Sequence, residues 1–282
     1  MEIHPIVTIT YYTLLILFTA LMVNPWTALV CIVVQLFILG LWKGPKAAGK
    51  ALGYTVTLTL LFTAINAFLN QRGNTPLLFI NEVPVTLESM VRGALSGGLI
   101  AALVLVFQSA ACFIDNGKLL FVIGRVSPTA ALMVCMTLRF IPYYGRQLKQ
   151  LKETQQALGY NTHRAAVKLF WAMLSENLET SIETQHSMQY RGYGSEGPKN
   201  HQESRYHFTG ADTGKMVVVL LMAAGILLLL LMRVYEYTFF PYMQGHPGMI
   251  WGVALYGIFS ILPIIYKIWE EIAWKRYTRL KI

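Results

Sequence analysis

Long apolar runs separated by short polar segments dominate the hydrophobic pattern of this 282-residue chain. A membrane-spanning helix needs about 20 mostly apolar residues. Six runs approach that length and predict spanning helices over 6–22, 27–42, 52–69, 87–113, 216–232 and 249–266. The chain is therefore expected to be an all-α integral membrane protein with about six transmembrane helices.

A polar region interrupts this pattern between the fourth and fifth runs, and its spacing predicts two long helices. Ser127 and Pro128 are typical of a helix start, and Gly159 of a helix end. Pro142 is expected to kink or end this first helix. We accordingly expect three parts: 1–114 with four spans, a helical cytoplasmic region over 115–214, and 215–282 with two spans and a basic tail.

The second polar helix is expected to begin after a cap at Asn161 or Thr162 and to stop at Gly192. Its apolar residues recur at intervals of three and four, which is typical of one face of an amphipathic helix. They are Val167, Phe170, Trp171, Leu174, Leu178 and Ile182. Such helices offer apolar area to each other or to partner membrane subunits.

Composition and charge agree with a membrane protein. The chain is 55% hydrophobic and only 13% charged, whereas soluble domains carry about 25% charged residues. Its net charge of +9 indicates basic cytoplasmic loops rather than nucleic-acid binding. Lys43, Lys46 and Lys50 make the segment after the second run cytoplasmic by this rule, and both termini then lie in the cytoplasm.

Candidate catalytic groups are few. Glu176, Glu179 and Glu183 share one helix face, which suits either acid–base chemistry or a solvated surface. The histidines show no shared metal-ligand spacing, and no P-loop sequence is present, so neither a metal site nor nucleotide hydrolysis by this chain is expected. The glycine-rich segment 93–98 lies inside a span, where small residues allow close helix packing.

The second polar helix ends on the sequence MQYRGYG, which places Arg191 at its C-terminal end. The helix dipole favours a cation there, so one interpretation is simple capping. The other is a guanidinium presented at a helix tip, where its planar fork can pair with carboxylates of a partner.

This segment resembles the second signature of the transmembrane T component of energy-coupling factor (ECF) transporters, in which Ala-Arg-Gly precedes an aromatic residue. Three further segments are similar to that family in the same order. They are HPIVTITYY, NQRGNTPLLFINEVPVTLESMVRGALSGGLIAALVL and GKLLFVIGRVSPTAALMVCMTLRFIPYYGRQLKQLKETQQALG. The resemblance covers most of the chain.

The resemblance implies a non-catalytic subunit in a bacterial or archaeal plasma membrane. Two ABC-type ATPases, which bind the ATP, dock on its long cytoplasmic coupling helices. A small membrane S component captures a vitamin or a metal ion such as cobalt, and ATPase motion reaches it through those helices. The chain itself is then expected to hold no cofactor.

The family's two signatures map onto the two helix ends. The second corresponds to Tyr190, Arg191 and Gly192, with tyrosine in place of the usual alanine. The first falls at Ala157, Leu158 and Gly159, where Leu158 occupies the arginine position. One of the two ionic anchors for the ATPases is therefore absent, and either apolar packing or a neighbour such as Lys152 replaces it.

Two alternatives from other classes remain at this point. An integral membrane enzyme acting on lipid would use the glutamate face or the histidines and would be active as the purified chain alone. A self-contained channel or carrier would need polar residues lining its spans, and few are visible. Two long helices ending in Leu-Gly and Arg-Gly favour the coupling function over both.

Overall fold

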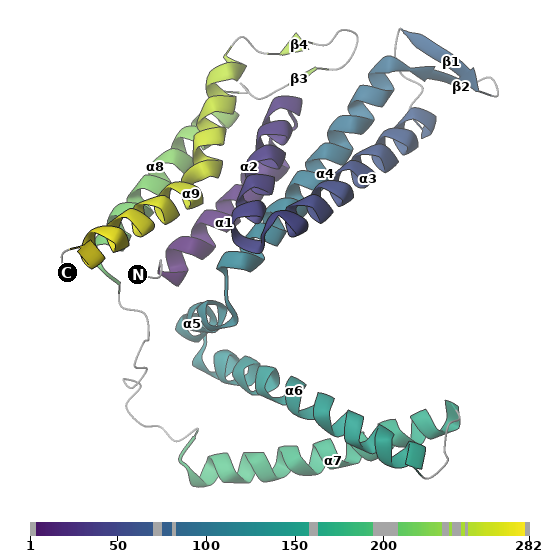
Figure 1. The fold of residues 1–282 in the computed structure, drawn as a ribbon, viewed down its shortest axis with the longest axis vertical. Coiled ribbons are helices and arrows are strands. Elements are labelled where there is room, and N and C mark those ends of the chain that lie inside the picture. The colour runs from purple at the N-terminus through teal and green to yellow at the C-terminus, as the bar shows by residue number, and fades with distance from the viewer. Residues whose placement is uncertain are drawn as a thin grey trace. The chain divides into compact units, whose positions relative to one another are not determined.

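The computed structural model describes residues 4–69, 75–80, 83–157, 163–193, 208–232, 237–238, 244–245 and 248–279 (Figure 1). The described chain is helical apart from two short antiparallel hairpins, so the predicted all-α class is confirmed. The helices are α1 (Pro5–Leu21), α2 (Pro25–Lys43), α3 (Pro45–Leu69), α4 (Leu87–Phe113), α5 (Asn116–Val126), α6 (Pro128–Ala157), α7 (His163–Tyr190), α8 (Gly210–Leu231) and α9 (Met249–Arg279). The hairpins pair β1 (Pro76–Ile80) with β2 (Val83–Thr86), and β3 (Tyr237–Thr238) with β4 (Gln244–Gly245).

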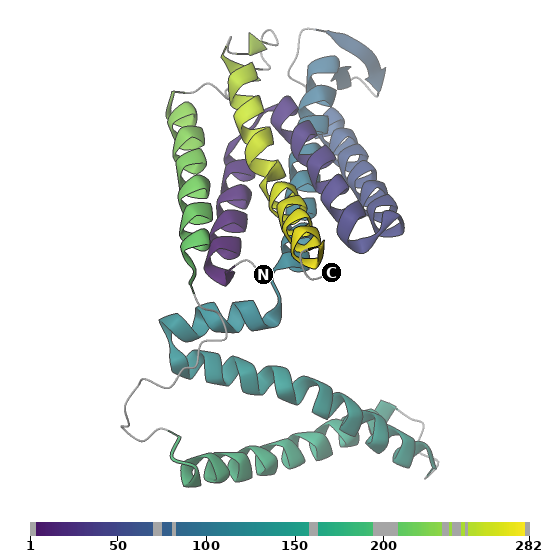
Figure 2. The ribbon, with the colours of Figure 1, turned by 60° about the vertical axis from the view of Figure 1, so that its left-hand side comes forward.

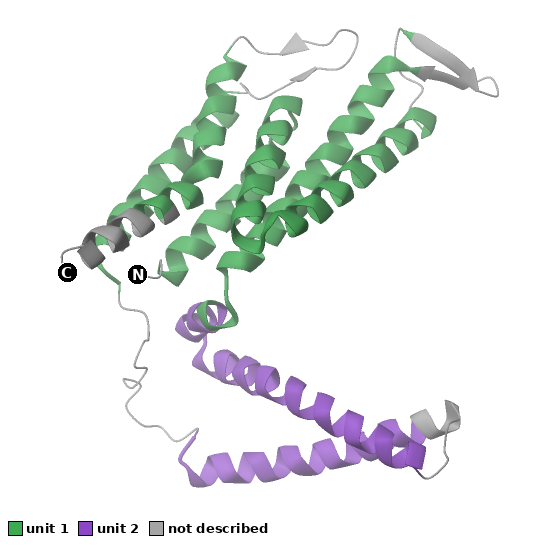
Figure 3. Ribbon diagram, in the orientation of Figure 1, with its two compact units in different colours: residues 1–118, 206–282 green, residues 119–205 purple. Residues whose placement is uncertain are grey.

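The chain divides into two compact units, which are described separately (Figure 3). The first comprises Met1–Lys118 and Tyr206–Ile282 and holds α1–α4, α8 and α9. The second comprises Leu119–Arg205 and holds most of α5 together with α6 and α7.

Five described helices of the first unit are long and apolar enough to cross a membrane: α2, α3, α4, α8 and the first part of α9, Met249–Tyr266. The sequence predicted about six such spans. The remaining one, α1, is apolar but has 17 residues, which rise about 26 Å against a hydrocarbon core of about 30 Å. We therefore describe the chain as a multi-pass membrane protein.

The third span begins earlier than predicted. The sequence placed its start at residue 52 and treated the preceding lysines as a loop, but α3 begins at Pro45. Gly44 has a φ of +90°, a conformation that ends α2, and Pro45 is preset for the first turn of a new helix. Lys46 and Lys50 therefore lie on the helix itself.

Buried apolar side chains from α1, α2, α4, α8 and α9 form the main core of the first unit. Figure 2 shows α8 on one flank of this bundle and the α3–α4 pair on the other. The largest fully buried side chains include Leu15, Phe18, Ile226, Tyr256 and Phe259. A dry core of this kind fixes the relative positions of the spans by dispersion contacts.

Helices α3 and α4 approach each other most closely at two glycines. A Cβ atom on Gly93 would lie 2.8 Å from Thr63 Cα, and one on Gly97 would lie 2.8 Å from Thr59 Cα. The two glycines are four residues apart and so share one face of α4. The predicted close packing at residues 93–98 is thereby confirmed, and α3 is the helix that it brings near.

A buried tyrosine compensates for a proline inside α9. Pro263 has no N–H, so the carbonyl of Phe259, four residues earlier, loses its helical partner. The hydroxyl of Tyr11 on α1 donates to this carbonyl and to that of Ser260, each at 3.2 Å. In lipid such a carbonyl has no water to bond, so Tyr11 both satisfies the break and ties α1 to α9.

Replacing Tyr11 with phenylalanine tests this role. The ring contact with Phe259, at a centroid distance of 5.1 Å, is retained, but the Phe259 carbonyl loses the hydroxyl that replaces its missing helical donor. We expect a loss of about 1–2 kcal/mol of stability, measured as a lower thermal unfolding midpoint in mild detergent. The matched control is Tyr54→Phe, because Tyr54 is 63% exposed on α3. Equal midpoints for the two variants would refute the role.

Candidate partner-docking site

The first long helix of the second unit begins as the sequence predicted. The N–H of Ala130 donates to Ser127 Oγ at 3.4 Å, and Pro128 is the first residue of α6. The sequence predicted that Pro142 kinks or ends the helix. It does not end the helix, because α6 continues to Ala157. Proline removes one backbone hydrogen bond, and good helix formers on both sides, such as Leu and Gln, continue the helix through it.

This unit has almost no core of its own. None of the described residues of α6 is buried, and the described side chains of α7 from Val167 onward are half-buried or exposed. Because α7 is a helix, the predicted apolar residues share one face of it. Their side chains are exposed, with exposed fractions from 37% at Leu174 to 61% at Phe170. Apolar surface of this extent on two long helices is typical of a binding surface.

The C-terminal end of α7 is closed by its own backbone. The N–H of Gly192 donates to the carbonyl of Gln189 at 2.9 Å, and that of Tyr193 donates to the carbonyl of Met188 at 3.1 Å. Gly192 has a φ of +79°. These features define a Schellman motif, which confirms Gly192 as the stop signal.

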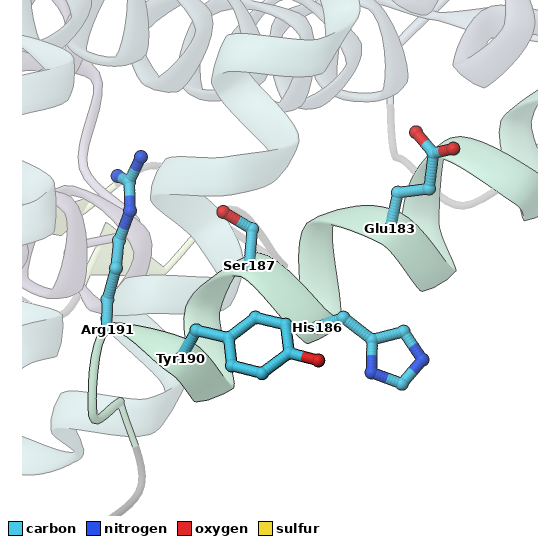
Figure 4. A pocket seen from close by; sticks show the side chains of 5 residues that line it. All are labelled: Glu183, His186, Ser187, Tyr190 and Arg191. Carbon is cyan, nitrogen blue, oxygen red and sulfur yellow. The ribbon is translucent and has the colours of Figure 1, made fainter.

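Arg191 is exposed at this tip beside a hollow of about 590 Å³, which is lined by Glu183, His186, Ser187, Tyr190 and Arg191 (Figure 4). Spacings of four residues place Arg191 in line with Ser187 and Glu183, and Tyr190 in line with His186. Tyr190 is 89% exposed. At the tip, Arg191 points to one side of the helix, and the Tyr190 ring and the His186 imidazole point to another (Figure 4).

The side chain of Arg191 is not needed to satisfy the last carbonyls of α7. The last turn of α7 already uses backbone N–H groups for its carbonyls. Among the residues that the structure describes, no carboxylate forms an ion pair with the Arg191 guanidinium. Five N–H donors of a guanidinium are thus available to an acidic partner.

The other predicted tip is only partly described. Ala157 is the last residue of α6 and is exposed, whereas Leu158 and Gly159 lie outside the described residues. Lys152, the alternative cation for this tip, is exposed on α6. The two tips differ in chemistry at the signature position: arginine at one, leucine at the other.

The catalytic alternative gains no support from the geometry. Glu176, Glu179 and Glu183 are all exposed along α7. No group of three potential metal ligands occurs within the described part of the chain; His201 and His207 lie outside it.

Sequence reasoning overlooked the neighbours of Arg191. It treated Glu183 and His186 only as possible catalysts, although both line the hollow at the helix tip. The available signal was their spacing: Glu183 lies eight positions before Arg191, and His186 lies four positions before Tyr190, so each shares a helix face with a residue of the tip.

Comparisons with known proteins identify a family. The family model CbiQ, described as cobalt transport protein, matches residues 2–203 of this chain. The match extends from the start of the first span through both helix tips, Ala157 to Gly159 and Tyr190 to Gly192. No curated protein matches the sequence.

Proposed function

The chain belongs to the CbiQ cobalt transport protein family, the family of ECF transporter T components, and from that premise we propose that it is the coupling subunit of an ECF-type ABC importer. The family and the apolar helices make it a membrane component of a transporter. The proposal adds the mechanical role, in which ATPase motion reaches a substrate-binding S component through α6 and α7.

The exposed guanidinium at the tip of α7, which forms no ion pair with a carboxylate of the described residues, carries this proposal. An ATPase that offers acidic side chains would pair with Arg191 bidentately, and Tyr190 would pack beside the pair. Because the Schellman motif fixes the backbone at Gly192, the charge lies at a defined point at the end of α7, a helix of 28 residues.

The uncovered apolar faces supply the second contact. Helices α6 and α7 carry large apolar side chains that nothing in their own unit buries, such as Met133, Ile141, Phe170 and Trp171. The S component is the proposed partner for this surface, since a small membrane protein offers apolar area in return. Displacement of the helices by the ATPases then moves the S component.

The α6 tip is proposed to hold the second ATPase without an arginine. Leu158 at the signature position favours apolar packing, and Lys152 offers a cation on the same helix. ATP binding and hydrolysis belong to the two ATPases, and the S component selects the vitamin or metal ion; cobalt is the cargo that the family name indicates. A bacterial or archaeal plasma membrane, with both termini cytoplasmic, is part of the same proposal.

Co-purification tests this function. The chain is tagged in its native host, extracted in mild detergent and analysed by mass spectrometry. We expect one or two kinds of ABC ATPase together with a small, very hydrophobic membrane protein. Recovery of the chain alone, under conditions that preserve a known membrane complex from the same cells, would contradict the proposal.

A further inference from the structure

One end of the first unit carries a group of lysines that the coupling function does not use. Lys43 is the last residue of α2, while Lys46 and Lys50 lie in the first two turns of α3. Lys118 is the third residue of α5, which begins shortly after the end of α4. All four belong to the first unit.

Contacts between neighbouring residues hold the helix ends that carry these lysines close together. The ring of Trp42, next to Lys43, lies 4.5 Å from the ring of Phe113 at the end of α4. Lys118 Nζ donates to the carbonyl of Phe113 at 3.0 Å. A Cβ atom on Gly40 would lie 3.7 Å from Ala48 Cβ, which places the last turns of α2 beside the first turn of α3.

The helix dipole favours Lys43 in the last turn of α2, but the fold does not account for Lys46 and Lys50. Lys43, Lys46 and Lys50 are exposed, and none forms an ion pair with a carboxylate among the residues that the structure describes. The first turn of α3 has no acidic residue, and the helix dipole disfavours lysines at that end. Lys118 differs, because it caps the Phe113 carbonyl.

Helices α2, α3 and α4 are candidate membrane spans, so the ends that carry these lysines lie at the level of the lipid headgroups. Lysines in that position are attracted to anionic lipids. We propose that Lys43, Lys46 and Lys50 form a binding surface for the phosphate groups of anionic phospholipids.

Lipid binding by the purified full-length chain tests the inference. The chain in mild detergent is titrated with phosphatidylglycerol or phosphatidylcholine, and bound lipid is counted by native mass spectrometry. The test variant is Lys43→Gln/Lys46→Gln/Lys50→Gln. The matched control, Arg146→Gln/Lys149→Gln/Lys168→Gln, removes the same charge from exposed basic residues of α6 and α7.

We expect the unaltered chain and the control to bind phosphatidylglycerol in preference to phosphatidylcholine. The test variant should bind phosphatidylglycerol at least roughly tenfold more weakly, because each lysine near an anionic surface contributes several-fold. Equal phosphatidylglycerol binding by the test variant and the control would overturn the inference. So would displacement of the lipid by inorganic phosphate at equal concentration, which would assign the surface to free phosphate. The assay contains no ATPase, so its failure would not bear on the coupling function.

Discussion

Exchanging Arg191 for glutamate is expected to abolish ATPase binding at the α7 tip while the chain still folds and inserts. Removing one partner of a desolvated ion pair costs about 3–5 kcal/mol, or roughly a hundred- to several-thousand-fold in Kd. The cost to the isolated chain is smaller, about 0.3–1 kcal/mol for an unfavourable charge at a helix C-terminus. The substitution should therefore prevent docking without unfolding the helix. Co-purification of the ATPases with tagged variants measures the loss of docking.

Three further substitutions make the Arg191 test specific. Arg191→Lys keeps the charge but lacks the planar fork, so it should retain partial binding, whereas Arg191→Ala should retain less. Arg146→Glu makes the same charge reversal at an exposed position of α6 away from the tip and should leave binding intact. If Arg191→Glu co-purifies with the ATPases as the unaltered chain does, Arg191 is only a helix cap.

Replacing Gly97 with alanine is expected to force α3 and α4 apart. The added Cβ atom would meet Thr59 Cα at 2.8 Å and Phe62 Cβ at 2.9 Å, distances that real Cβ atoms do not tolerate. Relief requires a backbone shift, because one obstacle is the main chain of α3. Overpacking of this kind costs about 1–3 kcal/mol per site, so Gly93→Ala/Gly97→Ala together should prevent recovery of a folded chain.

Gly98 provides the matched control for this prediction. It is adjacent to Gly97 in the same helix, yet a Cβ atom there would meet nothing within 4 Å. Gly98→Ala should therefore be neutral or slightly stabilising, because alanine is the better helix former. The yield of monodisperse protein on size exclusion and its thermal midpoint compare the variants. Similar losses for Gly97→Ala and Gly98→Ala would show that the close approach of α3 and α4 does not matter.

Local patterns in the sequence were sufficient for most of the helical fold. Apolar runs located the spans, and Ser127, Pro128 and Gly192 marked helix ends because each acts on backbone groups within a few residues. The sequence also predicted close helix packing at residues 93–98, since small residues four positions apart in a membrane helix allow another helix to approach closely. The helix that occupies the gap was not, because that depends on packing between distant segments.

Features set by tertiary partners were missed. The donor from Tyr11 to the carbonyls beside Pro263 joins residues about 250 positions apart, and no local pattern predicts it. The start of α3 at Pro45 was missed because hydropathy gave more weight to Lys46 and Lys50 than to the Gly44–Pro45 helix signal. Helix α5 was hidden by its short length of 11 residues.

The candidate site was predictable in position but not in surroundings. The sequence indicated that Arg191 stands at a helix tip, and the structure adds that the tip is exposed and closed by the Schellman motif. Whether Arg191 only caps α7 or also binds a partner stays a prediction. The docking roles of Ala157, Leu158 and Gly159 stay predictions, since Leu158 and Gly159 fall outside the described residues.

Photo-crosslinking from the α7 tip tests the central claim most directly. Tyr190, which is 89% exposed, is replaced by a photoreactive phenylalanine derivative of similar shape, and native membranes are illuminated. We expect a covalent adduct with an ABC ATPase, and none from the same probe at Leu221, which is 68% exposed on the membrane helix α8. Absence of any ATPase adduct at Tyr190, in membranes where the ATPase is present, would contradict it.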